Sequence, residues 1–135
     1  MIRTFIDSGV LIAAARGVGN GADRAIEILG DTRREFASGV FLKLEVLPKA
    51  IYNGRTAEAD FYQTYFDAVT YWATDVETLI EAAYQESTRY GLGAMDALHI
   101  VAAVSVEAEE FITYEKPGKS IYRTESIRVI SARSE

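Results

Sequence analysis

Apolar and polar positions along the chain follow two periods, one typical of buried strands and the other of helices. The segment IRTFI (2–6) is a short, mostly apolar run, which predicts a buried strand. The segment SGVLIAAA (8–15) follows it directly and predicts a short helix, with Ser8 in position to cap its start. The glycine-rich stretch 17–21 predicts a loop, and the segment 22–31 predicts a second helix.

The rest of the chain continues this alternation of strand and helix patterns. Ser38 and the pair Thr74 and Glu77 are placed to cap two of the later helices. The helix predicted at 94–109 is apolar almost all round, so we expect it to be central. We predict helices at 39–54, 56–72, 74–91 and 94–109, and strands at 34–38, around 71–75, at 109–114, 120–123 and 126–132. This order predicts an α/β fold with a mostly parallel sheet and helices on both faces.

Length and composition predict one globular domain over 1–135. The chain has 135 residues, of which 49% are hydrophobic, and the composition is not that of a disordered protein. It has no cysteine, which excludes disulfides and thiolate zinc sites and fits the reducing cytoplasm, where we expect the protein. One histidine, His99, leaves little room for a histidine-rich metal site. No apolar run reaches the ~20 residues of a membrane-spanning helix, so we expect no membrane partner.

The formal net charge of −6 argues against a general basic surface for nucleic acid. This argument weakens if some of the acids are metal ligands, because a bound divalent ion would cancel their charge locally. Several acids lie where a solvated helix or strand face is expected: Glu58, Asp60, Glu81, Glu86, Glu107, Glu109 and Glu110.

Four other acids fit a solvated face less well. Asp7 and Glu115 follow predicted strands, whereas Glu45 and Asp96 lie on predicted helices beside apolar positions. Each has an ordinary interpretation: Asp7 could accept hydrogen bonds from the next turn, Asp96 could favour a helix start, Glu45 could pair with Lys49, and Glu115 could be a loop acid.

Together, however, the four acids suggest a site. Ligands of α/β sheets bind outside the carboxyl ends of the strands, and a parallel sheet can bring these four side chains to that edge. Converging carboxylates repel one another and cannot all stay ionised without compensation. A divalent cation such as Mg²⁺ or Mn²⁺, which prefers oxygen ligands, would provide that compensation.

Four segments carry a family resemblance: FIDSGVLI, LKLEVLPK, MDALHIVAA and FITYEK. In their order and spacing they resemble the PIN-domain family, particularly the VapC-type toxin ribonucleases, over nearly the whole chain from Asp7 to Glu115. The resemblance implies a PIN-like three-layer α/β/α fold and an endoribonuclease that uses Mg²⁺ or Mn²⁺. It also implies a small antitoxin that blocks the site, and a homodimer.

By this resemblance, the catalytic and metal-binding residues are Asp7, Glu45, Asp96 and Glu115. The chain departs from the family pattern at two positions. The fourth acid is usually Asp, and the extra methylene of Glu115 could shift a second ion or replace direct ligation by a water bridge. Gly9 stands where the family often has a small polar residue, which removes one hydrogen-bonding side chain.

Other residues can be interpreted in more than one way. Ser8 and Thr113 could orient the ligands, although Ser8 could equally be only a helix cap. Lys116 and Lys119, together with Arg123, could hold substrate phosphates or be ordinary solvated residues. We expect His99 to pack or lie at the surface rather than bind the metal, because Mg²⁺ prefers oxygen ligands.

The leading hypothesis from the sequence is therefore a metal-dependent endoribonuclease acting as the toxin of a toxin–antitoxin pair. One alternative is a non-catalytic PIN-like module that binds RNA or protein, with Glu115 marking a weakened site. Another is a stand-alone RNA-processing nuclease without an antitoxin. A phospho-acceptor signalling domain fits less well, because such a pocket needs an aspartate at the end of a middle strand, whereas Glu45 and Asp96 lie on predicted helices.

Overall fold

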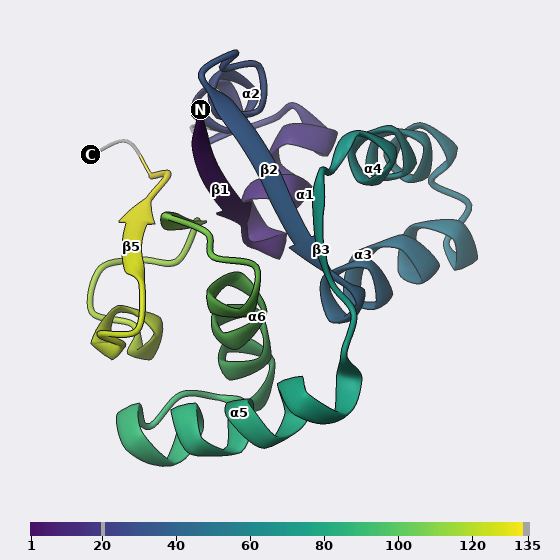
Figure 1. The fold of residues 1–135 in the computed structure, drawn as a ribbon. Helices are drawn as coiled ribbons and strands as arrows, with labels where there is room; N and C mark the ends of the chain where they lie inside the picture. Colours follow the sequence, from purple (N-terminus) through teal and green to yellow (C-terminus); the bar gives the residue numbers. More distant parts are fainter. Residues whose placement is uncertain (20, 134–135) are drawn as a thin grey trace.

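A five-stranded parallel sheet forms the middle of the molecule (Figure 1). The computed structural model describes residues 1–19 and 21–133. The strands are β1 (Ile2–Ile6), β2 (Arg34–Gly39), β3 (Tyr71–Ala73), β4 (Glu110–Thr113) and β5 (Arg128–Ser131). Their order across the sheet is β3-β2-β1-β4-β5, and every neighbouring pair is parallel. The predicted α/β class is confirmed, and the sheet is entirely parallel in the part of the chain that the structure describes.

Helices cover both faces of the sheet, which gives three layers (Figure 1). Successive side chains of a strand point to opposite faces, so Ile6 packs with one set of helices and Phe5 with the other. The first set is α1 (Ser8–Arg16), α2 (Ala22–Leu29), α3 (Val40–Tyr52) and α4 (Thr56–Ala68); the second is α5 (Val76–Tyr90) and α6 (Ala94–Ser105). Within 1–19 and 21–133, no helix is both long and apolar enough to cross a membrane.

The strand order reverses direction between β1 and β4. From β1 the chain moves outward to β2 and β3, then returns to the other side of β1 to form β4 and β5. The neighbouring carboxyl ends of β1 and β4 are joined by a hydrogen bond of 2.9 Å from the Asp7 amide to the Ile112 carbonyl. In open α/β sheets such a reversal leaves a crevice where ligands bind. The fold therefore places Asp7 and Thr113 beside the position where a site is expected.

Some local predictions from the sequence are wrong. The segment Ser120–Arg123 is a 3₁₀ helix and not a strand, because its backbone bonds to itself, with the Tyr122 amide donating to the Lys119 carbonyl at 3.2 Å. The predicted helices 56–72 and 94–109 end earlier, at Ala68 and Ser105.

The predicted helix caps are wrong by one residue. Asp7, not Ser8, caps α1, since its Oδ1 accepts from the Ser8 amide at 2.8 Å. Asp75, not Thr74, caps α5. Helix α3 begins after Gly39, and Ser38 lies buried in β2. Each observed cap lies one residue from the expected one, and preferences for capping residues do not fix a helix boundary to within one residue.

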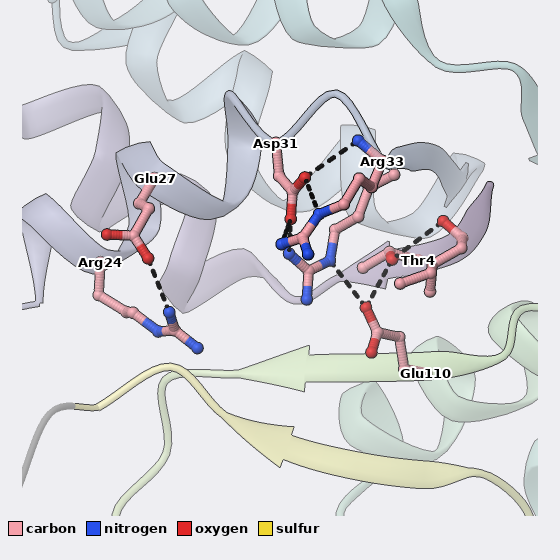
Figure 2. Close-up of polar contacts among 8 residues, drawn as sticks. Thr4, Arg24, Glu27, Asp31, Arg33 and Glu110 are labelled. Carbon is pink, nitrogen blue, oxygen red and sulfur yellow. Dashed lines mark hydrogen bonds and ion pairs between the residues drawn. The ribbon is translucent and has the colours of Figure 1, made fainter.

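Two acids expected on solvated faces are buried. Glu110 is 5% exposed, and its Oε2 accepts from Thr4 Oγ1 at 2.7 Å and from Arg34 Nε at 2.9 Å. Figure 2 shows this cluster, in which Asp31 binds the neighbouring arginine side chains at the amino ends of the strands. Glu86 accepts from the hydroxyl groups of Thr124 and Ser126 and ties α5 to the C-terminal segment. Both carboxylates have partners within the chain, which is how buried acids are normally compensated.

Candidate active site

The four predicted acids all line one cavity at the carboxyl edge of the sheet, with a volume of about 500 Å³. Asp7 follows β1 and Glu115 follows β4, whereas Glu45 comes from α3 and Asp96 from α6. We call it the acid cavity. Its remaining lining residues are Ser8, Gly9, Met95, His99, Thr113, Tyr114, Lys116, Lys119 and Arg133. The fold thus brings together acids that are up to 108 positions apart in the sequence (7 to 115).

Asp7 is the most buried of the four acids, with 6% of its surface exposed. Thr113 Oγ1 donates to its Oδ2 at 2.9 Å, and the Ser8 amide donates to its Oδ1 at 2.8 Å. Burial raises the pKa of Asp7, and these two hydrogen bonds only partly oppose it. Both carboxylate oxygens are therefore held in position, while the ionised form stays destabilised.

Asp96 lies in the first turn of α6, where the helix dipole favours an ionised carboxylate. The environment nevertheless raises the pKa of Asp96 to about 6. Partial burial is the largest cause, followed by repulsion from Asp7 and Glu115, with a smaller contribution from Glu45. The dipole is worth about 0.3–1 kcal/mol, which is less than these opposing effects. Repulsion from the other three acids therefore adds to the effect of burial on the pKa of Asp96.

Glu45 is held by a residue whose contact the sequence did not predict. His99, buried in α6, lies with its Nε2 2.8 Å from Glu45 Oε1. The hydrogen bond with His99 is the main cause of a lowered pKa at Glu45. Because an ionised carboxylate can only accept, Nε2 carries the hydrogen. The sequence allowed two interpretations of Glu45, as a partner of Lys49 or as a residue of the site. In the structure the carboxylate of Glu45 pairs with His99.

The backbone of Glu115 is fixed on both sides. Its amide donates to Thr113 Oγ1 at 3.2 Å, and its carbonyl accepts from Tyr122 Oη at 2.7 Å. Thr113 is fully buried and contacts both Asp7 and Glu115. Thr113 therefore links the carboxylate of Asp7 to the backbone of Glu115.

The glycine at position 9 has a packing reason. A Cβ atom built on Gly9 would lie 3.1 Å from Cβ of Tyr114, which is tighter than ordinary van der Waals contact. Helix α1 therefore packs closely against the residue that follows β4, and a polar side chain at position 9 would separate them. The departure from the family pattern keeps these two elements close together.

Basic side chains line the acid cavity as well as acids. Lys116 and Lys119 line it as the sequence suggested, whereas Arg123 does not and instead donates to the Gly91 carbonyl at 3.4 Å. The sequence did not predict Arg133, which also lines the cavity. Its guanidinium lies 4.9 Å from the ring centroid of Tyr114 and donates to the backbone carbonyl of Tyr114 at 3.2 Å. Arg133 follows β5, so its position after a strand beside β4 was the signal that could have found it.

The donor set of the acid cavity suits a hard divalent cation, although the side chains are not grouped around one point. Among residues 1–19 and 21–133, no three His, Asp or Glu side chains are placed so that they could hold a metal ion together. Glu45 bonds to His99, and Asp7 bonds to Thr113 and Ser8. Closing such a set around an ion would need rotations of the acid side chains. The mutual repulsion felt by Asp96 is the feature that a cation would relieve.

Among the comparisons with known proteins, only solved structures match the chain, and they agree on its fold. No protein-family model matches the sequence, and no curated protein matches it. Several solved structures do match. A chain of the VapBC2 complex from Rickettsia felis, bound to promoter DNA, has a TM-score of 0.72 at 10% identity over 96% of this chain and 98% of its own.

Two further structures are similar to the chain over most of its length. A chain of a toxin–antitoxin complex from Klebsiella pneumoniae has a TM-score of 0.71 at 16% identity, over 98% of this chain and 99% of its own. VapC20 of Mycobacterium tuberculosis, described as a toxin that cleaves the sarcin–ricin loop, has a TM-score of 0.68 at 13% identity, over 87% and 92%. At these identities the likeness concerns the fold, and the chain therefore has the PIN-like three-layer α/β/α fold found among VapC-type toxin structures.

Proposed function

We propose that the chain is a metal-dependent endoribonuclease that hydrolyses RNA phosphodiester bonds and acts as the toxin of a type II toxin–antitoxin pair. One observation carries this proposal: four carboxylates, two that follow β1 and β4 and two on α3 and α6, line one cavity where the strand order reverses. Burial raises the pKa of Asp96, and repulsion from Asp7, Glu115 and Glu45 adds to this effect. The fold shared with VapC-type toxins supports the same activity.

In this proposal Asp7, Glu45 and Asp96 hold the main ion. A bound Mg²⁺ or Mn²⁺ would polarise the phosphate and lower the pKa of a bound water. Thr113 fixes the Asp7 carboxylate, and His99 fixes that of Glu45. Glu115 extends into the cavity from a fixed backbone on a longer side chain than aspartate.

The remaining cavity residues would bind the substrate. Lys116 and Lys119 are the nearest candidates for phosphate contacts, because they line the same cavity as the acids. Ser8 contributes its backbone amide to Asp7. In this way the acids and the lysines would act on adjacent parts of one RNA strand.

The partners follow from the same proposal. One of the similar structures is described as a toxin–antitoxin complex, and another as VapBC2 bound to a DNA fragment from its promoter. We therefore propose a small antitoxin as a partner of this chain. Homodimerisation and a cytoplasmic location remain proposals that rest on the sequence resemblance and on the cysteine-free composition.

The test of the proposed activity is cleavage of RNA by the purified chain with and without a divalent ion. We expect internal cuts in a mixed pool of structured and single-stranded RNA with Mg²⁺ or Mn²⁺, and none with excess chelator, because the acids need a cation to act. Cutting that persists in chelator would contradict metal dependence. Intact RNA in every condition, despite measurable Mn²⁺ binding, would contradict the nuclease activity.

One observation favours a second candidate, a PIN-like module that binds RNA or protein without cutting. As placed, the acid side chains in the described part of the chain do not form a three-ligand group. Calorimetric titration with Mn²⁺ separates the two candidates. The nuclease should bind Mn²⁺, whereas the module should show no binding even at millimolar concentrations.

The contact between His99 and Glu45 leads to a prediction with a built-in control. A His99→Leu protein should bind Mn²⁺ about tenfold more weakly, because residues that orient metal ligands typically contribute 10- to 100-fold to affinity. His99→Gln keeps an N–H donor on the side chain and should recover part of that affinity. Calorimetry with thermal unfolding as a folding check measures both. Equal affinities for the Leu variant and the unsubstituted chain would show that His99 only packs.

A further inference from the structure

A second, smaller cavity of about 170 Å³ adjoins the acid cavity. Its lining residues come from α1, α3, the turn after α3, and α4, and Glu45 lines both cavities. We call it the arginine cavity. Its charged lining residues other than Glu45 are Arg16, Lys49, Arg55 and Glu58. Three cations and two acids, Glu45 and Glu58, therefore line this cavity in a chain whose formal charge is −6.

Glu58 holds the two arginines of this cavity in place. Its Oε1 accepts from Arg16 Nε at 3.1 Å and lies 3.7 Å from Arg55 Nη1. Its Oε2 accepts from Tyr62 Oη at 2.9 Å. The side chain of Glu58 is 13% exposed, whereas those of Arg16 and Arg55 are 47% and 51% exposed.

These contacts leave hydrogen-bond donors free to bind an anion. A guanidinium group has five N–H donors, and Glu58 engages Arg16 through only one nitrogen. Arginines fixed by a carboxylate have less conformational freedom to lose when they bind a phosphate. Glu45, the other acid of this cavity, is bonded to His99 and not to either arginine.

We propose that the arginine cavity binds a backbone phosphate of the RNA strand whose neighbouring phosphodiester lies in the acid cavity. This inference rests on the proposed function. The acid cavity carries its own cations, Lys116, Lys119 and Arg133, so basic groups lie in both cavities that Glu45 joins. A polyanion with regularly repeated phosphates can use both sets at once, which a single small anion cannot. The negative net charge means that attraction of RNA must come from such local groups.

The test compares two pairs of substitutions that remove the same charge. Lys49→Gln with Arg55→Gln alters the arginine cavity, and Arg89→Gln with Arg128→Gln alters exposed cations outside both cavities. Both pairs are made in the Asp96→Asn chain, so that the RNA stays intact with Mg²⁺ present. Fluorescence anisotropy of a labelled single-stranded RNA then gives affinity as a function of salt, and thermal unfolding confirms that each protein is folded.

We expect the cavity pair to bind RNA about tenfold more weakly at low salt than the Asp96→Asn chain. We also expect the slope of log affinity against log salt to become shallower by at least about 0.7, the contribution of one phosphate contact on a single strand. The control pair should lose much less affinity and keep the slope. An unchanged slope for the cavity pair, or equal losses in both pairs, would overturn the proposal.

Two parallel measurements separate this inference from others. If the cavity pair binds an acidic peptide such as polyglutamate more weakly but keeps its RNA slope, the cavity serves a protein partner and the inference is wrong. Cleavage by the unsubstituted chain is assayed alongside. No cleavage with the slope difference intact contradicts the nuclease proposal alone, whereas normal cleavage with unchanged slope contradicts the phosphate site alone.

Discussion

An Asp96→Asn protein is expected to lose at least about 100-fold of its metal-dependent RNA cleavage while remaining folded. Loss of a direct ligand should exceed the 10- to 100-fold effect of residues that only orient ligands. Asparagine keeps nearly the same shape as aspartate but carries no charge. Burial and the nearby Asp7, Glu115 and Glu45 raise the pKa of the Asp96 carboxyl to about 6. The substitution therefore relieves repulsion, and the melting temperature near neutral pH should not fall. Gel-resolved RNA cleavage and thermal unfolding measure the two effects.

Asp23 provides a matched control. It is an exposed aspartate in the first turn of α2, as Asp96 is in the first turn of α6, but it does not line the acid cavity. Asp23→Asn makes the same change of charge at the same kind of helix position. It should leave cleavage within about twofold, since surface substitutions away from a site have small effects. Full cutting by the Asp96→Asn protein would sink the proposed role of Asp96, and equal losses in both variants would show a general effect of charge.

The second large effect concerns pH and metal. The pKa of Asp96 is about 6 against an ordinary value of 3.8, and that of Asp7 is also raised. A carboxyl whose folded-state pKa is raised binds its proton more tightly in the folded chain, so it opposes folding once it is ionised. For Asp96, this destabilising contribution therefore grows as pH rises from about 4 to about 6 and then stays constant. Glu45, whose pKa is lowered, acts in the opposite sense and loses its contribution only below about pH 4.5.

The expected result is a melting temperature that depends on pH and metal together. In the metal-free chain the shift at Asp96 should cost about 1–2 kcal/mol at pH 7, after allowance for its partial exposure. The Asp96→Asn protein lacks this cost, so the difference in its favour should increase between pH 4.5 and pH 7. Adding Mg²⁺ or Mn²⁺ at pH 7.5 should raise the melting temperature of the unsubstituted chain by several degrees, and much less at pH 5.

Calorimetric scans of both proteins at the two pH values, with chelator or with Mn²⁺, measure this. A stability difference that does not change with pH would show that Asp96 does not titrate with a raised pKa. Equal stabilisation of both proteins by Mn²⁺ would place the ion away from Asp96. Glu115 can be included in the same series, because it contributes to the pKa of Asp96.

The sequence predicted the acid cavity better for strand residues than for helix residues. Asp7 and Glu115 follow buried strands, and the carboxyl ends of neighbouring parallel strands meet at one edge. For Glu45 and Asp96, the side that faces the cavity depends on how α3 and α6 pack, which local periodicity does not encode. Their apolar neighbours in the sequence singled out these two positions, and the resemblance to PIN domains gave them a metal-binding role.

The contacts that the sequence did not predict join residues that lie far apart in the chain. His99 bonds to Glu45, 54 positions earlier, and Glu110 bonds to Thr4, 106 positions earlier. Glu86 is held by Thr124 and Ser126. Each is polar and, taken locally, consistent with a packed or solvated position. Only the topology of the sheet and helices brings the compensating groups within reach.

Asp7 is both the first residue of the acid cavity and the cap of α1. One of its oxygens holds the start of the helix, and the other is held by Thr113. A longer acid at this position would have to give up one of these contacts, so position 7 has little freedom to change. Within residues 1–19 and 21–133, the hydrogen bonds of Glu115 are made by its backbone, which leaves its side chain free to vary in length. The site is thus rigid on one side and adaptable on the other, and a glutamate in place of aspartate is found on the adaptable side.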